Sequence, residues 1–297
     1  MLFRTPGWHD EQYNNRARIP EHPAILKHWA DASAAALRRH PELVELAYGP
    51  APREKLDVFP VRSPGAPVFV YLHGGYWRAL DKRDHSFVAP PLVDAGAMVV
   101  LPDYSLCPQV TVEHIVLQTV RALAWVYRHA REHGGDPERI VVAGHSAGGH
   151  LATMMLACRW AEVHPSLPAD LVKAALSISG IYELEPLRHA PFLAADLGLT
   201  VASALRSSPA WMPAPSGRLA VVVGGDESEE FHRQAELIRE NWGEKVVASE
   251  IVAGRNHMDV LHELASPGSN THQLALDLLE IRRPALAARG ALISSRS

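Results

Sequence analysis

Residues 139–148 read Arg139-Ile140-Val141-Val142-Ala143-Gly144-His145-Ser146-Ala147-Gly148, an apolar run followed directly by a Gly-x-Ser-x-Gly motif. The apolar run predicts a buried strand, and the Ala-, Leu- and Met-rich residues 149–160 predict a buried helix. The turn between them must be tight, so a Cβ atom at position 144 or 148 would collide with the strand or the helix. Such a turn strains the backbone of its serine and exposes the hydroxyl above the sheet edge. We therefore predict that Ser146 is a nucleophile at a strand-to-helix turn.

Apolar strands alternate with helices on both sides of this motif. Strands apolar throughout, separated by helices, predict a mostly parallel sheet covered on both faces. Together with the serine motif, this pattern predicts an α/β-hydrolase fold. The strands are predicted at residues 44–48, 55–61, 68–72, 97–101, 139–143, 171–178, 218–223 and 245–252, and the helices at 23–39, 84–94, 114–132, 149–160, 229–242 and 271–286.

A chain of 297 residues with this pattern is expected to form a single domain over residues 1–297. Residues 1–53 precede the main alternation and are predicted to be an N-terminal helical extension. Within them, the polar and aromatic stretch 13–18 predicts no firm structure. Residues 181–217 are predicted to be a lid-like insertion, and residues 290–297 a frayed tail.

Composition narrows the function classes. The chain is 47% hydrophobic and carries a formal net charge of −4, which gives no electrostatic reason to expect nucleic acid or an anionic membrane as a partner. No apolar run is long enough to cross a bilayer, and the first residues lack a signal-peptide core. Cys107 and Cys158 fall on a loop and a helix and are not expected to pair. We therefore expect a cytoplasmic protein acting on a small molecule, without metal or organic cofactor. The sequence leaves a homodimer open.

A serine hydroxyl needs a base to remove its proton, and the base needs an orienting carboxylate. In this fold the acid and then the histidine follow the serine, each after a later strand. Strand 218–223 runs into Gly224-Gly225-Asp226, and strand 245–252 is followed by a loop that reaches His257. We therefore predict a catalytic triad of Ser146, Asp226 and His257.

Other residues near these strand ends are weaker candidates. Glu227 stands one residue too far along the loop, and His262 is expected on a helix beginning near Met258. His145 lies inside the elbow turn and is not expected to reach the hydroxyl of its neighbour. Glu229 and Asp259 are the remaining alternatives for the acid.

His73-Gly74-Gly75 follows strand 68–72, two strand–helix units upstream of the serine. In α/β-hydrolases the oxyanion hole is built at this position, because glycines let backbone amides approach the reacting carbonyl. We predict oxyanion donors from the backbone of Gly74 or Gly75, together with that of Ala147. The helix that begins after Ser146 directs partial positive charge to the same place.

The aromatic pair Tyr76 and Trp77 comes next and is predicted to line the substrate pocket. The insertion carries apolar side chains suited to a partial lid. It is short for a lipase lid, which indicates a small, soluble substrate. These side chains are Leu184, Leu187, Phe192, Leu193 and Trp211.

Three segments of the chain resemble the kynurenine formamidase (arylformamidase) family: residues 73–77 (His-Gly-Gly-Tyr-Trp), 144–151 (Gly-His-Ser-Ala-Gly-Gly-His-Leu) and 225–228 (Gly-Asp-Glu-Ser). The resemblance extends to residues 13–16 (Tyr-Asn-Asn-Arg) and 179–187 (Ser-Gly-Ile-Tyr-Glu-Leu-Glu-Pro-Leu), so it spans nearly the whole chain. Residues 103–108 (Asp-Tyr-Ser-Leu-Cys-Pro) are similar to a segment of small carboxylesterases of the hormone-sensitive-lipase type.

The resemblance implies hydrolysis of N-formyl-L-kynurenine to L-kynurenine and formate, with Ser146, Asp226 and His257 in the triad. It implies no metal and no organic cofactor, and no motif identifies a partner for the amino-acid end of such a substrate. A broad-specificity carboxylesterase is the alternative. A non-catalytic binding protein with this fold is disfavoured, because such proteins usually lack one residue of the triad.

Overall fold

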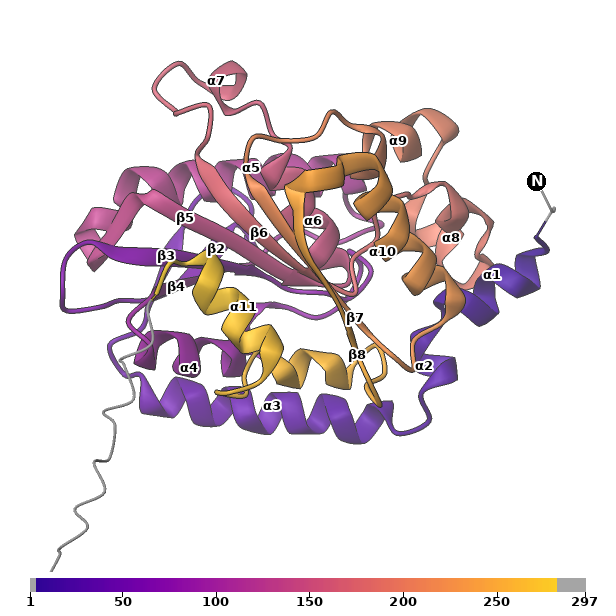
Figure 1. Cartoon of the computed structure of the whole chain (residues 1–297), viewed down its shortest axis with the longest axis horizontal. Coiled ribbons are helices and arrows are strands. Elements are labelled where there is room, and N and C mark those ends of the chain that lie inside the picture. Colours follow the sequence, from indigo (N-terminus) through magenta and orange to yellow (C-terminus); the bar gives the residue numbers. More distant parts are fainter. Residues whose placement is uncertain (1–3, 282–297) are drawn as a thin grey trace, which may run out of the picture.

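A computed structural model describes residues 4–281 of the chain. These residues form one eight-stranded sheet in the order β1-β2-β4-β3-β5-β6-β7-β8 (Figure 1). Strands β3 to β8 run parallel, and the hairpin β1–β2 joins β4 through an antiparallel pair. The strands are β1 (Val44–Ala47), β2 (Lys55–Phe59), β3 (Ala66–Leu72), β4 (Met98–Pro102), β5 (Gly135–His145), β6 (Val172–Ile178), β7 (Arg218–Gly224) and β8 (Val246–Val252).

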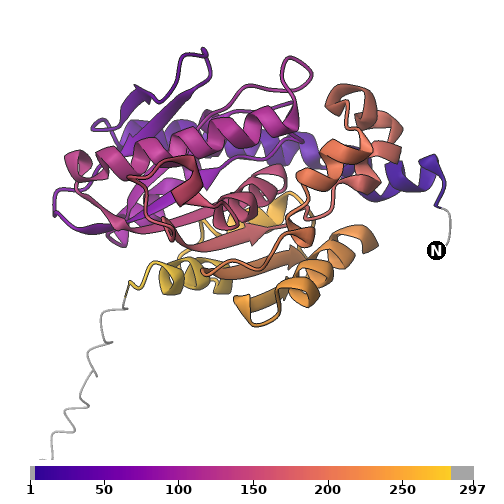
Figure 2. The same ribbon diagram turned by 90° about the horizontal axis from the view of Figure 1, so that it is seen from above.

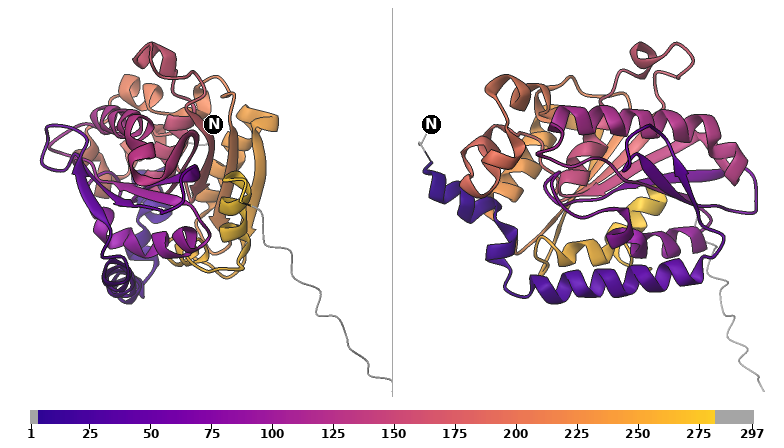
Figure 3. Two further views of the ribbon diagram at one scale, coloured as in Figure 1. Left: turned by 90° about the vertical axis from the view of Figure 1, so that its left-hand side faces the viewer. Right: turned by 180° about the vertical axis from the view of Figure 1, so that it is seen from behind.

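Helices cover both faces of this sheet, because successive side chains of its buried strands point to opposite sides. In β3, Val68 and Val70 belong to one apolar core, whereas Phe69 and Tyr71 belong to the other. The first core is closed by α5 (Val112–His129), α6 (Ala147–Leu156) and α10 (Glu229–Trp242), and the second by α3 (His22–Arg39), α4 (Ala89–Asp94) and α11 (Asn270–Leu278). The left panel of Figure 3 shows indigo α3 and magenta α5 on opposite sides of the sheet. The predicted α/β-hydrolase fold is confirmed.

Two predicted helices differ in detail. Residues 84–94 split into a 3₁₀ helix over Lys82–Val88 and the short helix α4, with prolines in the first turn of α4. A proline has no N–H to continue an earlier helix, but it suits a first turn. The closing helix α11 ends at Leu278. Residues 282–286 of that predicted helix, and the predicted tail 290–297, lie outside the described residues.

The stretch 13–18, for which the sequence predicted no firm structure, is mostly helical. It contains the end of α1 (Pro6–Tyr13) and all of α2 (Asn15–Arg18). The Asn14 side chain accepts a hydrogen bond from the Ala17 amide and so caps the short helix. A helix of four residues is too short to show an apolar periodicity, which explains why the sequence pattern missed it.

The N-terminal helices and the insertion meet at one end of the sheet. Figure 2 shows indigo α1 beside the salmon-coloured helices of the insertion, α8 (Pro191–Leu197) and α9 (Val201–Arg206). The Asp10 carboxylate accepts a hydrogen bond from the Phe192 amide at 3.1 Å, which joins α1 to α8. The short helix α7 (Trp160–Val163) lies in the connection before β6. Within residues 4–281, no helix combines the length and the apolar character needed to span a membrane.

Candidate active site

Ser146 occupies the sharp turn between β5 and α6 with a φ of 57° and a ψ of −118°. This left-handed backbone is strained for a residue with a side chain. A Cβ atom at Gly144 would lie 2.2 Å from the Gly148 carbonyl oxygen, and one at Gly148 would lie 1.9 Å from the Leu72 carbonyl oxygen. The two glycines of the motif are therefore required by close backbone contacts, as the sequence predicted.

A continuous hydrogen-bonded chain leads from this serine through a histidine to a glutamate. The Ser146 hydroxyl donates to Nε2 of His257 over 3.0 Å. Nδ1 of His257 donates to Oε2 of Glu227 over 2.6 Å. A carboxylate oxygen can only accept, so the proton of a neutral His257 lies on Nδ1 and leaves Nε2 free to take the serine proton. All three side chains are buried.

The carboxylate that is hydrogen-bonded to His257 belongs to Glu227 and not to the predicted Asp226, whose side chain is exposed to solvent. The loop after β7 turns back on itself, with the Glu227 amide donating to the Gly224 carbonyl oxygen at 3.2 Å. Asp226 falls at the corner of that turn and points outward, while the next residue returns toward the sheet edge. Sequence counting placed the acid at the first carboxylate after the strand and did not allow for this turn.

The second oxygen of Glu227 is also held. Oε1 accepts from the Ser179 hydroxyl at 2.5 Å and from the Gly224 amide at 2.7 Å. These donors stabilise the ionised carboxylate and fix its orientation toward His257. Ser179 follows β6 directly, with a φ of 50°, and it is not among the predicted site residues. A polar residue immediately after a buried strand was the signal that could have identified it.

The histidine alternatives have other partners. His262 accepts a hydrogen bond from the Trp29 indole at 2.9 Å, and burial lowers its pKa to about 4. Nε2 of His145 donates to the His257 carbonyl oxygen at 2.6 Å. Burial lowers the pKa of His145 well below its usual value, so the ring stays neutral while it supports the backbone of His257.

The carboxylate alternatives lie elsewhere too. Glu229 is exposed in the first turn of α10. Asp259 accepts from the Asn256 amide at 2.7 Å, which closes the turn that carries His257. Neither carboxylate bonds to His257 in the described residues.

The predicted oxyanion loop lies against the nucleophile. A Cβ atom at Gly74 would come within 3.4 Å of the Ser146 Cβ atom. Gly75 has a φ of +108°, and a Cβ atom there would lie 2.1 Å from the Ala79 carbonyl oxygen. Ala147 is the first residue of α6, where an amide has no partner inside its own helix. Within residues 4–281, the amides of Gly74, Gly75 and Ala147 donate to no protein acceptor, so they remain able to bind an oxyanion.

A buried polar cluster fixes the residue before these glycines. Nε2 of His73 lies 3.1 Å from the Asp103 carboxylate, which also binds Arg53 at 2.7 Å. The Tyr104 ring stacks on the His73 ring at 4.1 Å, and its hydroxyl donates to the His73 carbonyl oxygen at 2.7 Å. Through these contacts Asp103 and Tyr104 hold His73 in place, and with it the glycine loop that follows.

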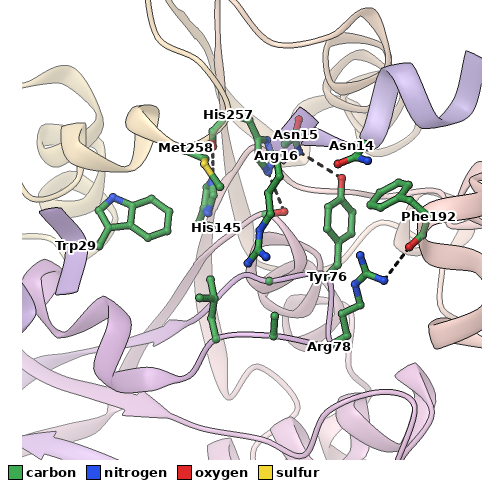
Figure 4. A pocket seen from close by; sticks show the side chains of 14 residues that line it. Asn14, Asn15, Arg16, Trp29, Tyr76, Arg78, His145, Phe192, His257 and Met258 are labelled. Atoms are coloured by element: carbon green, nitrogen blue, oxygen red, sulfur yellow. Dashed lines mark hydrogen bonds between the residues drawn. The ribbon is translucent and has the colours of Figure 1, made fainter. Parts of the chain in front are cut away.

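A pocket opens above Ser146 and His257, and Tyr76 lines it (Figure 4). Trp77, the second residue of the predicted aromatic pair, is fully buried and packs edge-on against His150 with ring centroids 5.0 Å apart. It is not among the described residues that line this pocket. The prediction for Trp77 is therefore corrected: it belongs to the core under the loop.

The N-terminal segment forms one wall of the pocket. The Tyr76 hydroxyl donates to the Tyr13 carbonyl oxygen at 2.5 Å and accepts from the Asn15 side chain at 3.3 Å. The Tyr13 hydroxyl donates in turn to Glu230 of α10 at 2.6 Å. These bonds connect residues 13–15 to the oxyanion loop and to α10, the helix after Glu227. No pattern in the sequence predicted these contacts.

The insertion contributes a single side chain to the pocket wall, that of Phe192. Arg78 holds it there by donating to the Phe192 carbonyl oxygen at 2.8 Å and pairing with Asp196. Of the other apolar residues singled out for the lid, Trp211 is 48% exposed and does not line the pocket. The remaining three are buried in the core beneath the insertion: Leu184, Leu187 and Leu193.

No group of three or more His, Cys, Asp or Glu side chains in residues 4–281 is arranged to hold a metal ion. Both cysteines, Cys107 and Cys158, are unpaired thiols.

Residues 69–276 match the α/β-hydrolase-fold family. Kynurenine formamidase from Danio rerio is 33% identical over 272 residues, which cover 88% of this chain and 89% of that protein. The chain belongs to the kynurenine formamidase-like family of α/β-hydrolases. Its relatives and its fold therefore identify it as a hydrolase.

Two further relatives show the breadth of related hydrolases. Esterase LipQ from Mycobacterium tuberculosis is 34% identical to this kynurenine formamidase-like hydrolase over 149 residues, 47% of this chain and 35% of that protein. The crystal structure of a candidate thioesterase from Silicibacter sp. TM1040 superposes with a TM-score of 0.79 and 30% identity, covering 92% of this chain and 97% of that one.

Proposed function

We propose that this hydrolase cleaves N-formyl-L-kynurenine to L-kynurenine and formate through a formyl-enzyme on Ser146. The observation that carries the proposal is the chain of hydrogen bonds from Ser146 through His257 to Glu227. Ser146 and His257 also line a pocket, one wall of which is formed by the N-terminal segment. The likeness to kynurenine formamidase over 88% of the chain supports the choice of substrate.

In the first half of the reaction, Oγ of Ser146 attacks the formyl carbon while Nε2 of His257 takes the hydroxyl proton. Glu227 stabilises the imidazolium that forms. The amides of Gly75 and Ala147 bind the oxyanion, with Gly74 as the alternative donor from the loop. As the tetrahedral intermediate collapses, the C–N bond breaks and His257 returns the proton to the departing aryl amine.

The second half releases formate. His257 takes a proton from a water molecule, whose oxygen attacks the formyl carbon of the formyl-serine. The C–Oγ bond then breaks, and His257 gives the proton back to Ser146. The aromatic ring of Tyr76, in the pocket wall, packs against the aromatic leaving group in this proposal.

The insertion 181–217 serves as a partial lid through Phe192 in this proposal, and residues 1–53 belong to the same domain as the sheet. A cytoplasmic location is part of the proposal too. It is supported by the two unpaired thiols, which persist in a reducing compartment.

The alternative is a broad-specificity carboxylesterase, favoured by the likeness to Esterase LipQ. Steady-state kinetics of the purified protein on N-formyl-L-kynurenine and on p-nitrophenyl acetate separate the two. A higher kcat/KM on the formamide supports the proposal, and a much higher value on the ester replaces it with the esterase.

A further inference from the structure

The part of the pocket wall that the N-terminal segment forms contains an arginine whose guanidinium has no hydrogen-bond or ion-pair partner in the described residues. Arg16 lies in α2, next to Asn15, and its side chain lines the pocket together with Ser146 and His257. Figure 4 shows it directed into the pocket between the side chains of His145 and Tyr76. No hydrogen bond or ion pair joins its guanidinium to any residue in the described part of the chain.

The charge balance of the pocket favours an anion. No aspartate or glutamate among residues 4–281 lines it, although the whole chain carries a formal net charge of −4. The second arginine in the wall, Arg78, is already neutralised by Asp196. Arg16 is thus the unpaired cation of the described pocket wall, and a guanidinium is suited to bind a carboxylate through two parallel hydrogen bonds.

The backbone that carries Arg16 is fixed on both sides. Asn14 caps α2 by accepting from the Ala17 amide, and the Asn15 side chain donates to the Tyr76 hydroxyl. Tyr76 itself follows the oxyanion loop, so the backbone of Arg16 is anchored beside the loop that faces the reacting serine.

We propose that Arg16 binds a carboxylate of the substrate at the end remote from the scissile bond, and so selects aryl formamides that carry a carboxylate over those that lack one. This inference rests on the proposed function, which assigns the amino-acid end of N-formyl-L-kynurenine to the same pocket. Arg16 would thus be the binding partner of the amino-acid end of the substrate, for which no sequence motif identified a partner. Arg16 is a specificity-determining residue, not a group that touches the reacting atoms.

The test compares two substrates that differ only in the carboxylate: N-formyl-L-kynurenine and the analogue in which a carboxamide replaces that carboxylate. For Arg16→Gln, we expect the ratio of kcat/KM on the carboxylate to kcat/KM on the carboxamide to fall about ten- to a hundredfold. The loss should fall mainly on KM, because the ion pair is the same in the ground state and the transition state. Arg16→Lys should restore part of the ratio.

Arg18 provides the matched control. It lies on the same helix and carries the same charge, but its guanidinium donates to the Glu11 carbonyl oxygen at 3.0 Å and does not line the pocket. Arg18→Gln should keep the wild-type ratio. Equal losses on both substrates in Arg16→Gln, or an equal fall of the ratio in Arg18→Gln, would overturn the proposal.

A second substrate pair keeps this inference separate from the proposed function. Aryl acetates with a carboxylate arm and with a carboxamide arm test the charge preference without a formamide. If the wild-type protein prefers esters, the formamidase proposal fails, while the charge ratio on the ester pair still tests Arg16. If the wild-type protein shows no preference for the carboxylate member of either pair, the role of Arg16 fails.

Discussion

Oε2 of Glu227 lies 2.6 Å from Nδ1 of His257, whereas the side chain of the preceding residue, Asp226, points to solvent. The carboxylate that can orient His257 therefore lies at the end of the turn after β7 and not at its corner. Glu227→Gln should lower kcat about 10⁴-fold, because an amide nitrogen facing Nδ1 favours the wrong imidazole tautomer. Asp226→Asn should leave kcat near the wild-type value. Steady-state kinetics of the two variants decide between the two acids, and the reverse pattern would return the role to Asp226.

Ser146→Ala should abolish turnover, with kcat reduced about a millionfold, and should also abolish labelling by a fluorophosphonate. The protein should still fold, because the substitution removes only one hydroxyl group and adds no atom that could clash with a neighbour. Thermal unfolding followed by circular dichroism checks the fold. Labelling that persists in the variant would show that another residue is the nucleophile.

Gly75→Ala should damage both stability and activity. Its Cβ atom would meet the Ala79 carbonyl oxygen at 2.1 Å, and the backbone has a φ of +108°. The strain should lower the free energy of unfolding by about 1–3 kcal/mol, and displacement of the loop should cost about 10²- to 10³-fold in kcat.

Gly65→Ala is the control for the backbone effect alone, since Gly65 also has a positive φ, +81°, but nothing lies within 4 Å of its Cβ position. It should lower stability modestly and leave kcat unchanged. A comparable loss of kcat in both variants would argue against a special role for the loop at Gly75.

Stability should fall as the solution is acidified below about pH 6.5. Burial lowers the pKa of His150 from 6.5 to about 4, so between these values the unfolded chain binds a proton that the folded protein does not. The free energy of unfolding therefore decreases with falling pH across this window, by up to about 1.4 kcal/mol per pH unit for this residue.

Urea unfolding of the wild type and of His150→Asn between pH 4 and pH 7 measures this slope. The variant should be less stable at pH 7, because it loses the hydrogen bond to the Ser207 carbonyl oxygen, but its slope should be shallower. Part of the slope should remain, since burial also lowers the pKa of His85, to about 3. Identical slopes would show that His150 does not titrate in this way.

Much of the fold could be predicted from the sequence because its signals are local. The apolar runs of β3, β5 and β6 and the glycines around Ser146 report directly on burial and on close backbone contacts. The position of Gly75 relative to the serine follows from the same order of strands and helices.

The parts that the sequence missed depend on where a loop turns and on what meets across the fold. The turn at Gly224 decides which of two adjacent carboxylates faces His257, and no periodicity records that turn. Trp77 and Tyr76 are neighbours in the chain but point into different environments. The contacts of Tyr13 and Asn15 with Tyr76 join segments about sixty residues apart, so only the folded chain brings them together.

The hydrogen bonds from Tyr76 to residues 13–15 join two parts of the site that have different roles in the proposed function. In the proposed mechanism the bond-breaking groups lie at the strand ends, whereas Arg16, the proposed specificity residue, lies in a short helix ahead of the sheet. A substitution at position 16 alone is then a route to new selectivity, because Tyr13 and Asn15 still hold Tyr76 and the oxyanion loop next to it.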